Sequence, residues 1–236
     1  MVGFKNQKLL VIAVHPDDEV LGCAGLINRV KSSGGKVYVL FMTVGNTQDF
    51  SKSGSSTFRQ RVSEIEKVAK FLKYDDYNIA FPGDSFHLKL DTVPQLELIS
   101  AIESGPFSIN TLKPDIIVTP QPSDYNQDHR AVAEAALAAC RSAPKELKHL
   151  PSMVLGAEFS PSASWGVSAI NIPNFYVALT EAQLEVKIKA MDLYSSQKRD
   201  GSHSRSSKAI RSLAYLRGTQ SGFEAAEAFF NFRTLV

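Results

Sequence analysis

Residues 8–25 read KLLVIAVHPDDEVLGCAG and decide how the start of the chain folds. The run over 8–14 is almost continuously apolar, as in a strand that a parallel sheet buries on both faces. This run ends at His15, three acids follow, and apolar residues then recur with the spacing of a helix over 19–31. We therefore expect a buried strand, a charged turn and a helix. Three adjacent carboxylates beside a histidine also require a nearby positive charge.

Strand and helix patterns alternate through the first two-thirds of the chain. Strands are expected at 8–14, 36–44, 77–81 and 115–120, and helices at 19–31, 57–73, 94–105 and 129–143. The last third mixes the two patterns, with strands at 151–160 and 175–180 and helices at 181–197 and 206–218. This order predicts an α/β chain with a Rossmann-like three-layer fold, a mostly parallel sheet and a mixed C-terminal extension. We interpret residues 1–236 as a single domain.

The composition argues against several classes of protein. The 236 residues are 44% hydrophobic and carry a formal net charge of +2 without a long Lys/Arg stripe, so nucleic acid is not expected as a partner. No apolar run reaches the ~18 residues of a membrane span. Cys23 and Cys140 are too few for a disulfide framework or a Cys-rich metal site. We expect a cytoplasmic protein, and whether it forms a homo-oligomer stays open.

Two polar loops are expected at the same edge of the sheet. VHPDDE at 14–19 follows the first strand, and QPSDYNQDHR at 121–130 follows the strand at 115–120. In open α/β sheets, ligands bind in the crevice beyond the carboxyl ends of the strands. Because parallel strands place both loops at that edge, their histidines and aspartates should meet across more than a hundred positions.

The residues of these loops predict a metal site. His15 and Asp18 come from one tight turn and can reach the same ion, and His129 would be the third ligand. Two histidines and a carboxylate, with water in the remaining position, form a catalytic zinc site, and iron accepts the same ligands. Asp17 is then free to act as general base on the metal-bound water, whose pKa the ion lowers toward ~7. The alternative is that the acids only favour the N-terminus of the following helix.

The same segments resemble the signatures of a known family. HPDDEVLGCAG at 15–25 resembles the first signature of the LmbE/PIG-L-like zinc deacetylases, and DYNQDHR at 124–130 resembles the second. Further similarities are Arg61-x-x-Glu64, Asp84 and the ending RGTQSGFEAAEAFFNFR at 217–233.

The resemblance implies a Rossmann-like fold and metal-dependent removal of an N-acetyl group from an amino sugar or its conjugate. It makes His15, Asp18 and His129 the metal ligands, with Zn²⁺ as the expected ion and Fe²⁺ or another divalent ion as alternatives. It makes Asp17 the catalytic base.

One position departs from the family pattern. Asn126 stands where many members carry a histidine that stabilises the oxyanion or protonates the leaving amine. We expect Asn126 to polarise the acetyl carbonyl, because its amide can donate a hydrogen bond, but it cannot carry a proton. Asp17 or another group must then return the proton, and His87 and His203 lie in loops that could reach the site. Asp128 is expected to orient a site imidazole, or else to be an ordinary acid at a helix start.

Three further side chains are expected at the substrate. Arg61 would bind a hydroxyl or phosphate, or else pair with Glu64. Asp84 would bond sugar hydroxyls, or else fix a turn. Trp165 would stack on a sugar face, or else be a partly buried core residue.

Together these features predict a zinc-dependent N-deacetylase with a small-molecule substrate, an N-acetylated amino sugar or a conjugate of one. Two alternatives stay open. The first is a related amidase that cleaves a larger amide conjugate with the same chemistry. The second is a non-catalytic Rossmann module that binds a sugar or nucleotide, with Asn126 marking lost activity.

Overall fold

The computed structural model describes residues 3–48, 54–144, 146–159 and 172–235. Within them the central sheet has seven strands, in the spatial order β5 (Asp76–Pro82), β2 (Lys36–Val44), β1 (Lys8–Ala13), β6 (Ile116–Thr119), β7 (Met153–Ala157), β9 (Ala225–Thr234) and β8 (Phe175–Leu179). The first five pair in parallel, and β9 is antiparallel to both β7 and β8. The predicted α/β fold with a mostly parallel sheet is confirmed.

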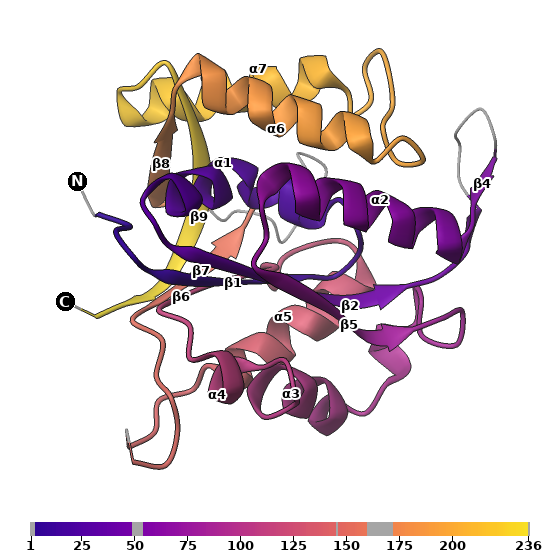
Figure 1. Ribbon diagram of the computed structural model, residues 1–236, viewed down its shortest axis with the longest axis vertical. Helices are drawn as coiled ribbons and strands as arrows, with labels where there is room; N and C mark the ends of the chain where they lie inside the picture. Colours follow the sequence, from indigo (N-terminus) through magenta and orange to yellow (C-terminus); the bar gives the residue numbers. More distant parts are fainter. Residues whose placement is uncertain (1–2, 49–53, 145, 160–171, 236) are drawn as a thin grey trace.

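Helices cover both faces of this sheet (Figure 1). One layer consists of α1 (Asp18–Ser32), α2 (Phe58–Leu72), α6 (Glu181–Leu193) and α7 (Ser207–Ser221). The opposite layer consists of α3 (Gln95–Glu103), α4 (Ile109–Leu112) and α5 (Gln127–Ala139). A 3-10 turn, η1 (Leu90–Thr92), precedes α3, and a small antiparallel pair, β3 (Thr47–Gln48) and β4 (Ser55–Ser56), precedes α2. In the described part of the chain, no helix is both long and apolar enough to cross a membrane.

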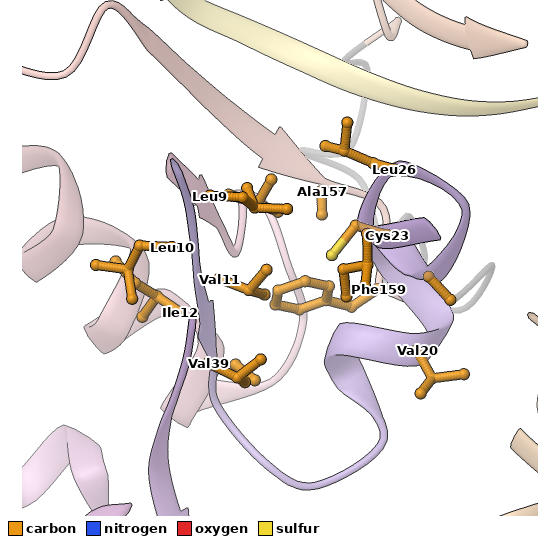
Figure 2. Close-up of a cluster of buried hydrophobic side chains, with 14 of the residues drawn as sticks. Leu9, Leu10, Val11, Ile12, Val20, Cys23, Leu26, Val39, Ala157 and Phe159 are labelled. Carbon is orange, nitrogen blue, oxygen red and sulfur yellow. The ribbon is translucent and has the colours of Figure 1, made fainter. Parts of the chain in front are cut away.

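Strand β1 lies in the middle of the core. Its side chains alternate between the two faces of the sheet, because successive residues of a strand point in opposite directions. Figure 2 shows Leu9 and Val11 on the side of α1, near Phe159, and Leu10 and Ile12 on the other side. All four β1 residues are fully buried, so the strand needs apolar residues at every position.

The sequence patterns missed β9 and placed the start of α5 two residues late. Strand β9 opens with Ala225, Ala226 and Glu227, which are poor strand formers, and its pairing with β7 and β8 determines its conformation. Helix α5 begins at Gln127 because Asn126 is its N-cap, with Oδ1 accepting a hydrogen bond of 2.9 Å from the backbone N–H of Asp128.

Helix α1 is interrupted at Cys23, and a side chain of β9 accepts hydrogen bonds from the backbone N–H groups beyond the interruption. Cys23 has non-helical φ and ψ of −152° and 23°, which frees the backbone N–H groups that follow it. The carboxylate of Glu227 accepts hydrogen bonds of 2.8 Å from the N–H groups of both Gly25 and Leu26. A Cβ on Gly25 would lie 2.4 Å from Cδ2 of Leu179, so any larger residue would force Leu179 to shift. The last strand therefore fixes the helix that carries Asp18.

Candidate active site

Three buried side chains meet beyond the carboxyl ends of β1 and β6. His15 follows β1, Asp18 is the first residue of α1, and His129 lies in the first turn of α5. Each offers one ligand atom, and these atoms all lie within 4.8 Å of one another. His129 Nε2 is 3.3 Å from His15 Nδ1 and 3.4 Å from Asp18 Oδ2. The structure thus brings together the three residues that the sequence singled out as metal ligands.

A carboxylate orients each of the two imidazoles. His15 Nε2 lies 3.0 Å from Asp128 Oδ2, and His129 Nδ1 lies 2.8 Å from Asp124 Oδ2. The other nitrogen of each ring is thereby left to face Asp18. Asp128 occupies the position expected of an orienting partner, whereas the role of Asp124 was not predicted. Its place in the DYNQDHR segment could have suggested it, because ligating histidines commonly have a carboxylate behind them.

The charges around this cluster favour a cation. Burial disfavours a charged His129, but Asp18 and Asp124 outweigh it and raise the pKa of His129 to about 10. Burial alone would raise the pKa of Asp18, yet His129 and His15 lower it to about 2. Two imidazoles and a carboxylate are also the donor set of catalytic zinc sites and of iron sites. The residues present therefore fit a divalent ion of this class.

Asp17 has an unusual backbone and a buried carboxylate. Its φ of 108° lies in the left-handed region, which is uncommon for residues other than glycine. Its backbone N–H donates to Glu19 Oε2 at 3.2 Å, and its side chain makes no capping hydrogen bond. Burial raises the pKa of Asp17, and the positive charge of Arg205 opposes this. Asp17 thus occupies the N-cap position of α1 without capping the helix by a side-chain hydrogen bond.

Glu19 anchors the HPDD turn in the protein interior through hydrogen bonds to two tyrosines. It is fully buried and accepts hydrogen bonds from the hydroxyl groups of Tyr194, at 2.6 Å, and Tyr74, at 3.2 Å. Burial raises the pKa of Glu19 to about 8. Its partners tie the turn to the residues that follow the C-terminal ends of α2 and α6, so the third acid of the HPDDE segment is held by the surrounding structure.

The Arg61-x-x-Glu64 pattern of α2 also faces the protein interior. Arg61 is 3% exposed, and its guanidinium donates to the carbonyl of Pro16 at 3.0 Å. Glu64 accepts from Ser195 Oγ at 2.9 Å and from Ser196 N and Oγ at 2.8 and 2.6 Å. Arg61 thus lies behind the HPDD turn, and its predicted contact with substrate remains a prediction.

Asp84 and His87 occupy a loop beside the site, whereas His149 lies away from it. Asp84 accepts from the backbone and side-chain nitrogens of Asn46, at 2.7 and 2.6 Å, and these bonds lower its pKa. His87 is buried with its ring centroid 5.3 Å from that of His15, and burial lowers its pKa to about 3. His149 bonds the carbonyl of Pro114 at the opposite end of β6. A sugar contact of Asp84 remains a prediction, and Trp165 lies outside the described residues.

A polar cavity of about 460 Å³ opens onto the cluster. Its lining consists of the proposed ligands, Leu21 of α1 and residues of two loops: His15, Asp18, Leu21, Asp124, Tyr125, Asn126, His129, His203, Ser204 and Arg205. Asn126 therefore borders the cavity while its amide oxygen caps α5. His203 reaches the site, as its loop position allowed, but Arg205 was not singled out from the sequence.

Known proteins resemble this chain in sequence and in structure. Residues 10–140 match the family model described as PIG-L: GlcNAc-PI de-N-acetylase. An uncharacterized deacetylase of Escherichia coli K12, YaiS, is 28% identical over 197 residues, or 81% of this chain and 92% of that protein. Diacetylchitobiose deacetylase of Thermococcus kodakarensis is 25% identical over 226 residues, or 94% of this chain and 81% of that protein. The N,N'-diacetylchitobiose deacetylase of Pyrococcus horikoshii has the same fold, with a TM-score of 0.72 at 21% identity over 96% of this chain and 84% of that one.

Proposed function

The chain belongs to the PIG-L family, and on that premise we propose that it is a metal-dependent N-deacetylase of an amino sugar or amino-sugar conjugate. One observation carries the proposal. The ligand atoms of His15, Asp18 and His129 converge within 4.8 Å, beside the buried Asp17. This is the arrangement that hydrolysis of an unreactive amide requires: a site for a Lewis acid and a neighbouring base.

His15 Nδ1, His129 Nε2 and Asp18 Oδ2 would hold the ion. When bound, a zinc or iron(II) ion supplies a Lewis acid that polarises the acyl oxygen and increases the acidity of water. The carboxylates of Asp128 and Asp124 keep the two imidazoles in the orientation that presents these nitrogens.

Asp17 would act as the base. Its carboxylate takes a proton from the attacking water, whose oxygen bonds to the acetyl carbon. The carbon–nitrogen bond then breaks, and the nitrogen receives the proton that Asp17 held, so acetate and a free amine leave. Asn126, at the rim of the cavity, is placed to orient the acetyl group.

The substrate class is supported by the relatives and by the cavity. Two of the similar proteins are named for the deacetylation of diacetylchitobiose, an N-acetylated sugar. The lining of the cavity here is mostly polar, which suits hydroxyl groups. We propose the cytoplasm as the compartment, on the ground that Cys23 and Cys140 are unpaired thiols.

Acetate release tests this function directly. The purified protein, supplied with zinc or with iron(II), should release acetate from N-acetylglucosamine or N,N'-diacetylchitobiose and should lose this activity with a chelator. A second panel with longer acyl groups tests the amidase alternative, since that enzyme would release the longer acids faster. If no member of either panel is cleaved although the protein binds the sugars, the chain is a binding module and the proposed function is wrong.

A further inference from the structure

Arg205 stands between Asp17 and the cavity. Its Nε lies 3.1 Å from Asp17 Oδ2, outside hydrogen-bonding geometry, and within the described residues neither carboxylate oxygen of Asp17 makes a hydrogen bond. The side chain of Arg205 is 33% exposed, whereas that of Asp17 is 1% exposed. The guanidinium therefore contacts the buried base on one side and lines the cavity on the other.

The segment that carries Arg205 is anchored at several points. It connects α6 to α7 (Figure 1), and the backbone N–H of Arg205 donates to His203 Nδ1 at 3.1 Å. One guanidinium nitrogen donates to Gln197 Oε1, also at 3.1 Å. Gln197 in turn bonds Ser196, whose hydroxyl and backbone N–H are held by Glu64 of α2. This chain of hydrogen bonds fixes the direction from which the guanidinium approaches the site.

In the part of the chain that the structure describes, no neighbouring group offers the same charge to the cavity. Among the described residues that line it, Arg205 is the only lysine or arginine. Asn126 is neutral, and its amide oxygen is used as the cap of α5. The ring of His87 packs edge-on against His15, and His87 is not part of the lining.

We propose that Arg205 is a catalytic residue that donates a hydrogen bond to the acyl oxygen as that oxygen becomes an oxyanion. The inference rests on the proposed deacetylation. When water adds to the acetyl carbon, the π electron pair of the C=O bond moves to oxygen, and Asp17 receives the proton of the water. Negative charge leaves the carboxylate and appears on the acyl oxygen, and the guanidinium is positioned to follow it.

When the tetrahedral intermediate collapses, negative charge moves back from the acyl oxygen to the carboxylate of Asp17. The electron pair returns to the carbonyl, the carbon–nitrogen bond breaks, and the proton on Asp17 passes to the nitrogen. Arg205 neither gains nor loses a proton at any stage, in keeping with a guanidinium that stays protonated in proteins. Arg205 supplies a positive charge, whereas the neutral amide of Asn126 is a weaker hydrogen-bond donor. The planar guanidinium also presents rigid N–H groups to a small oxyanion.

Kinetics of Arg205→Met and Arg205→Lys test the proposal on the metal-loaded protein. Loss of one oxyanion donor lowers kcat by roughly 10²–10³-fold, and the KM of a neutral N-acetyl sugar should change little. Lysine should restore only part of the rate, because its ammonium cannot reproduce the planar N–H pair. Arg211→Met is the matched control, since Arg211 pairs with Glu181 and Glu185 outside the cavity and its loss should leave kcat unchanged.

Two further measurements separate catalysis from a structural role. Millimolar guanidinium chloride should restore activity to Arg205→Ala, which leaves room for the ion, but not to Arg205→Met. Acetate, the expected product, should also bind Arg205→Met at least several-fold more weakly than wild type by calorimetry. The melting temperature of each variant should equal that of wild type. A variant that merely misfolds would have a lower melting temperature and would not be rescued by guanidinium.

Four results would overturn the inference. The first is a large rise in KM with kcat unchanged, which would make Arg205 a substrate-binding residue. The second is full recovery of kcat in Arg205→Met at raised pH, which would mean that Arg205 only keeps Asp17 ionised. The third is an Arg205→Met variant that releases acetate as fast as an active wild type, which would refute the Arg205 assignment alone. The fourth is a wild type that releases no acetate, which would refute the proposed function itself.

Discussion

Nε2 of His15 lies 3.0 Å from Oδ2 of Asp128, and this contact joins two segments that are 113 residues apart. The other oxygen of Asp128 accepts from the backbone N–H of Leu90 at 2.9 Å, so the carboxylate is fixed at both ends. Because it engages Nε2, it leaves Nδ1 of His15 to face Asp18 and His129. Two predictions about metal binding depend on this arrangement.

Asp128→Asn should weaken metal binding by roughly 10–100-fold, as is typical when the partner behind a ligating histidine is lost. The amide has nearly the same shape, so the fold should survive while the orientation of His15 is lost. Competition with a coloured chelator measures the affinity. Glu134→Gln, on the exposed side of α5, is the matched control and should bind zinc like wild type. Equal affinities for the Asp128 variant would show that this contact does not position a ligand.

The bound ion should also stabilise the fold. Zinc at about 100 times its dissociation constant should add ~2.7 kcal/mol to the free energy of unfolding, since it binds the native site. His129→Ala removes one ligand and should abolish most of this increment, although it changes the baseline stability as well. The comparison is therefore the melting temperature of each protein with and without zinc. An equal zinc-induced shift in both proteins would place the ion elsewhere.

Asp17→Asn should separate metal binding from catalysis. The amide cannot accept a proton from water, so kcat for acetate release should fall by roughly 10²–10⁴-fold. Zinc content should stay at the wild-type level, because Asp17 is not among the three convergent ligand atoms. Metal analysis and acetate assays on the same preparation give both values. Unchanged acetate release would refute the deacetylase proposal.

The sequence predicted the convergence of the site but not its surroundings. His15 and His129 follow adjacent parallel strands, and the geometry of such a sheet brings the ends of those strands together wherever the helices lie. Arg61 shows the limit of this reasoning. Its spacing to Glu64 suggested a pair or a substrate contact. The sequence did not show that Arg61 donates to the carbonyl of Pro16 or that Glu64 accepts from Ser196, and the substrate contact remains a prediction.

The individual roles of Arg205 and Glu227 were not predicted from the sequence, for a related reason. The position of Arg205 depends on hydrogen bonds from Gln197 and on the fold of the segment between two helices, neither of which follows a periodic pattern. Glu227 lies in a strand whose first residues have low strand propensity, and its role exists only because α1 is interrupted at Cys23. Long-range partners of this kind are set by tertiary packing.

Glu227 should be critical for stability. Its carboxylate binds two backbone N–H groups of α1 and Lys187 Nζ at 2.8 Å, with only 2% of the side chain exposed. Glu227→Ala leaves the buried Lys187 unpaired, which costs ~3–5 kcal/mol. Urea denaturation followed by circular dichroism measures the loss. Glu181→Gln removes an exposed partner of Arg211 and should have a far smaller effect, so similar losses would contradict a stabilising role for the contacts of Glu227 with α1 and Lys187.

Asn126→His should give the site a group that can carry a proton, at the expense of a helix cap. Histidine is a poorer N-cap than asparagine, so the free energy of unfolding should fall by ~1 kcal/mol. An imidazole at the rim of the cavity can share protonation of the leaving amine with Asp17, so kcat near neutral pH should rise. Asn126→Ala is the control: it loses the same cap, and its kcat should not rise. Paired urea and acetate-release measurements decide between the two effects. If both variants lose stability equally and neither gains rate, Asp17 alone returns the proton, and the amide of Asn126 matters mainly as the start of α5.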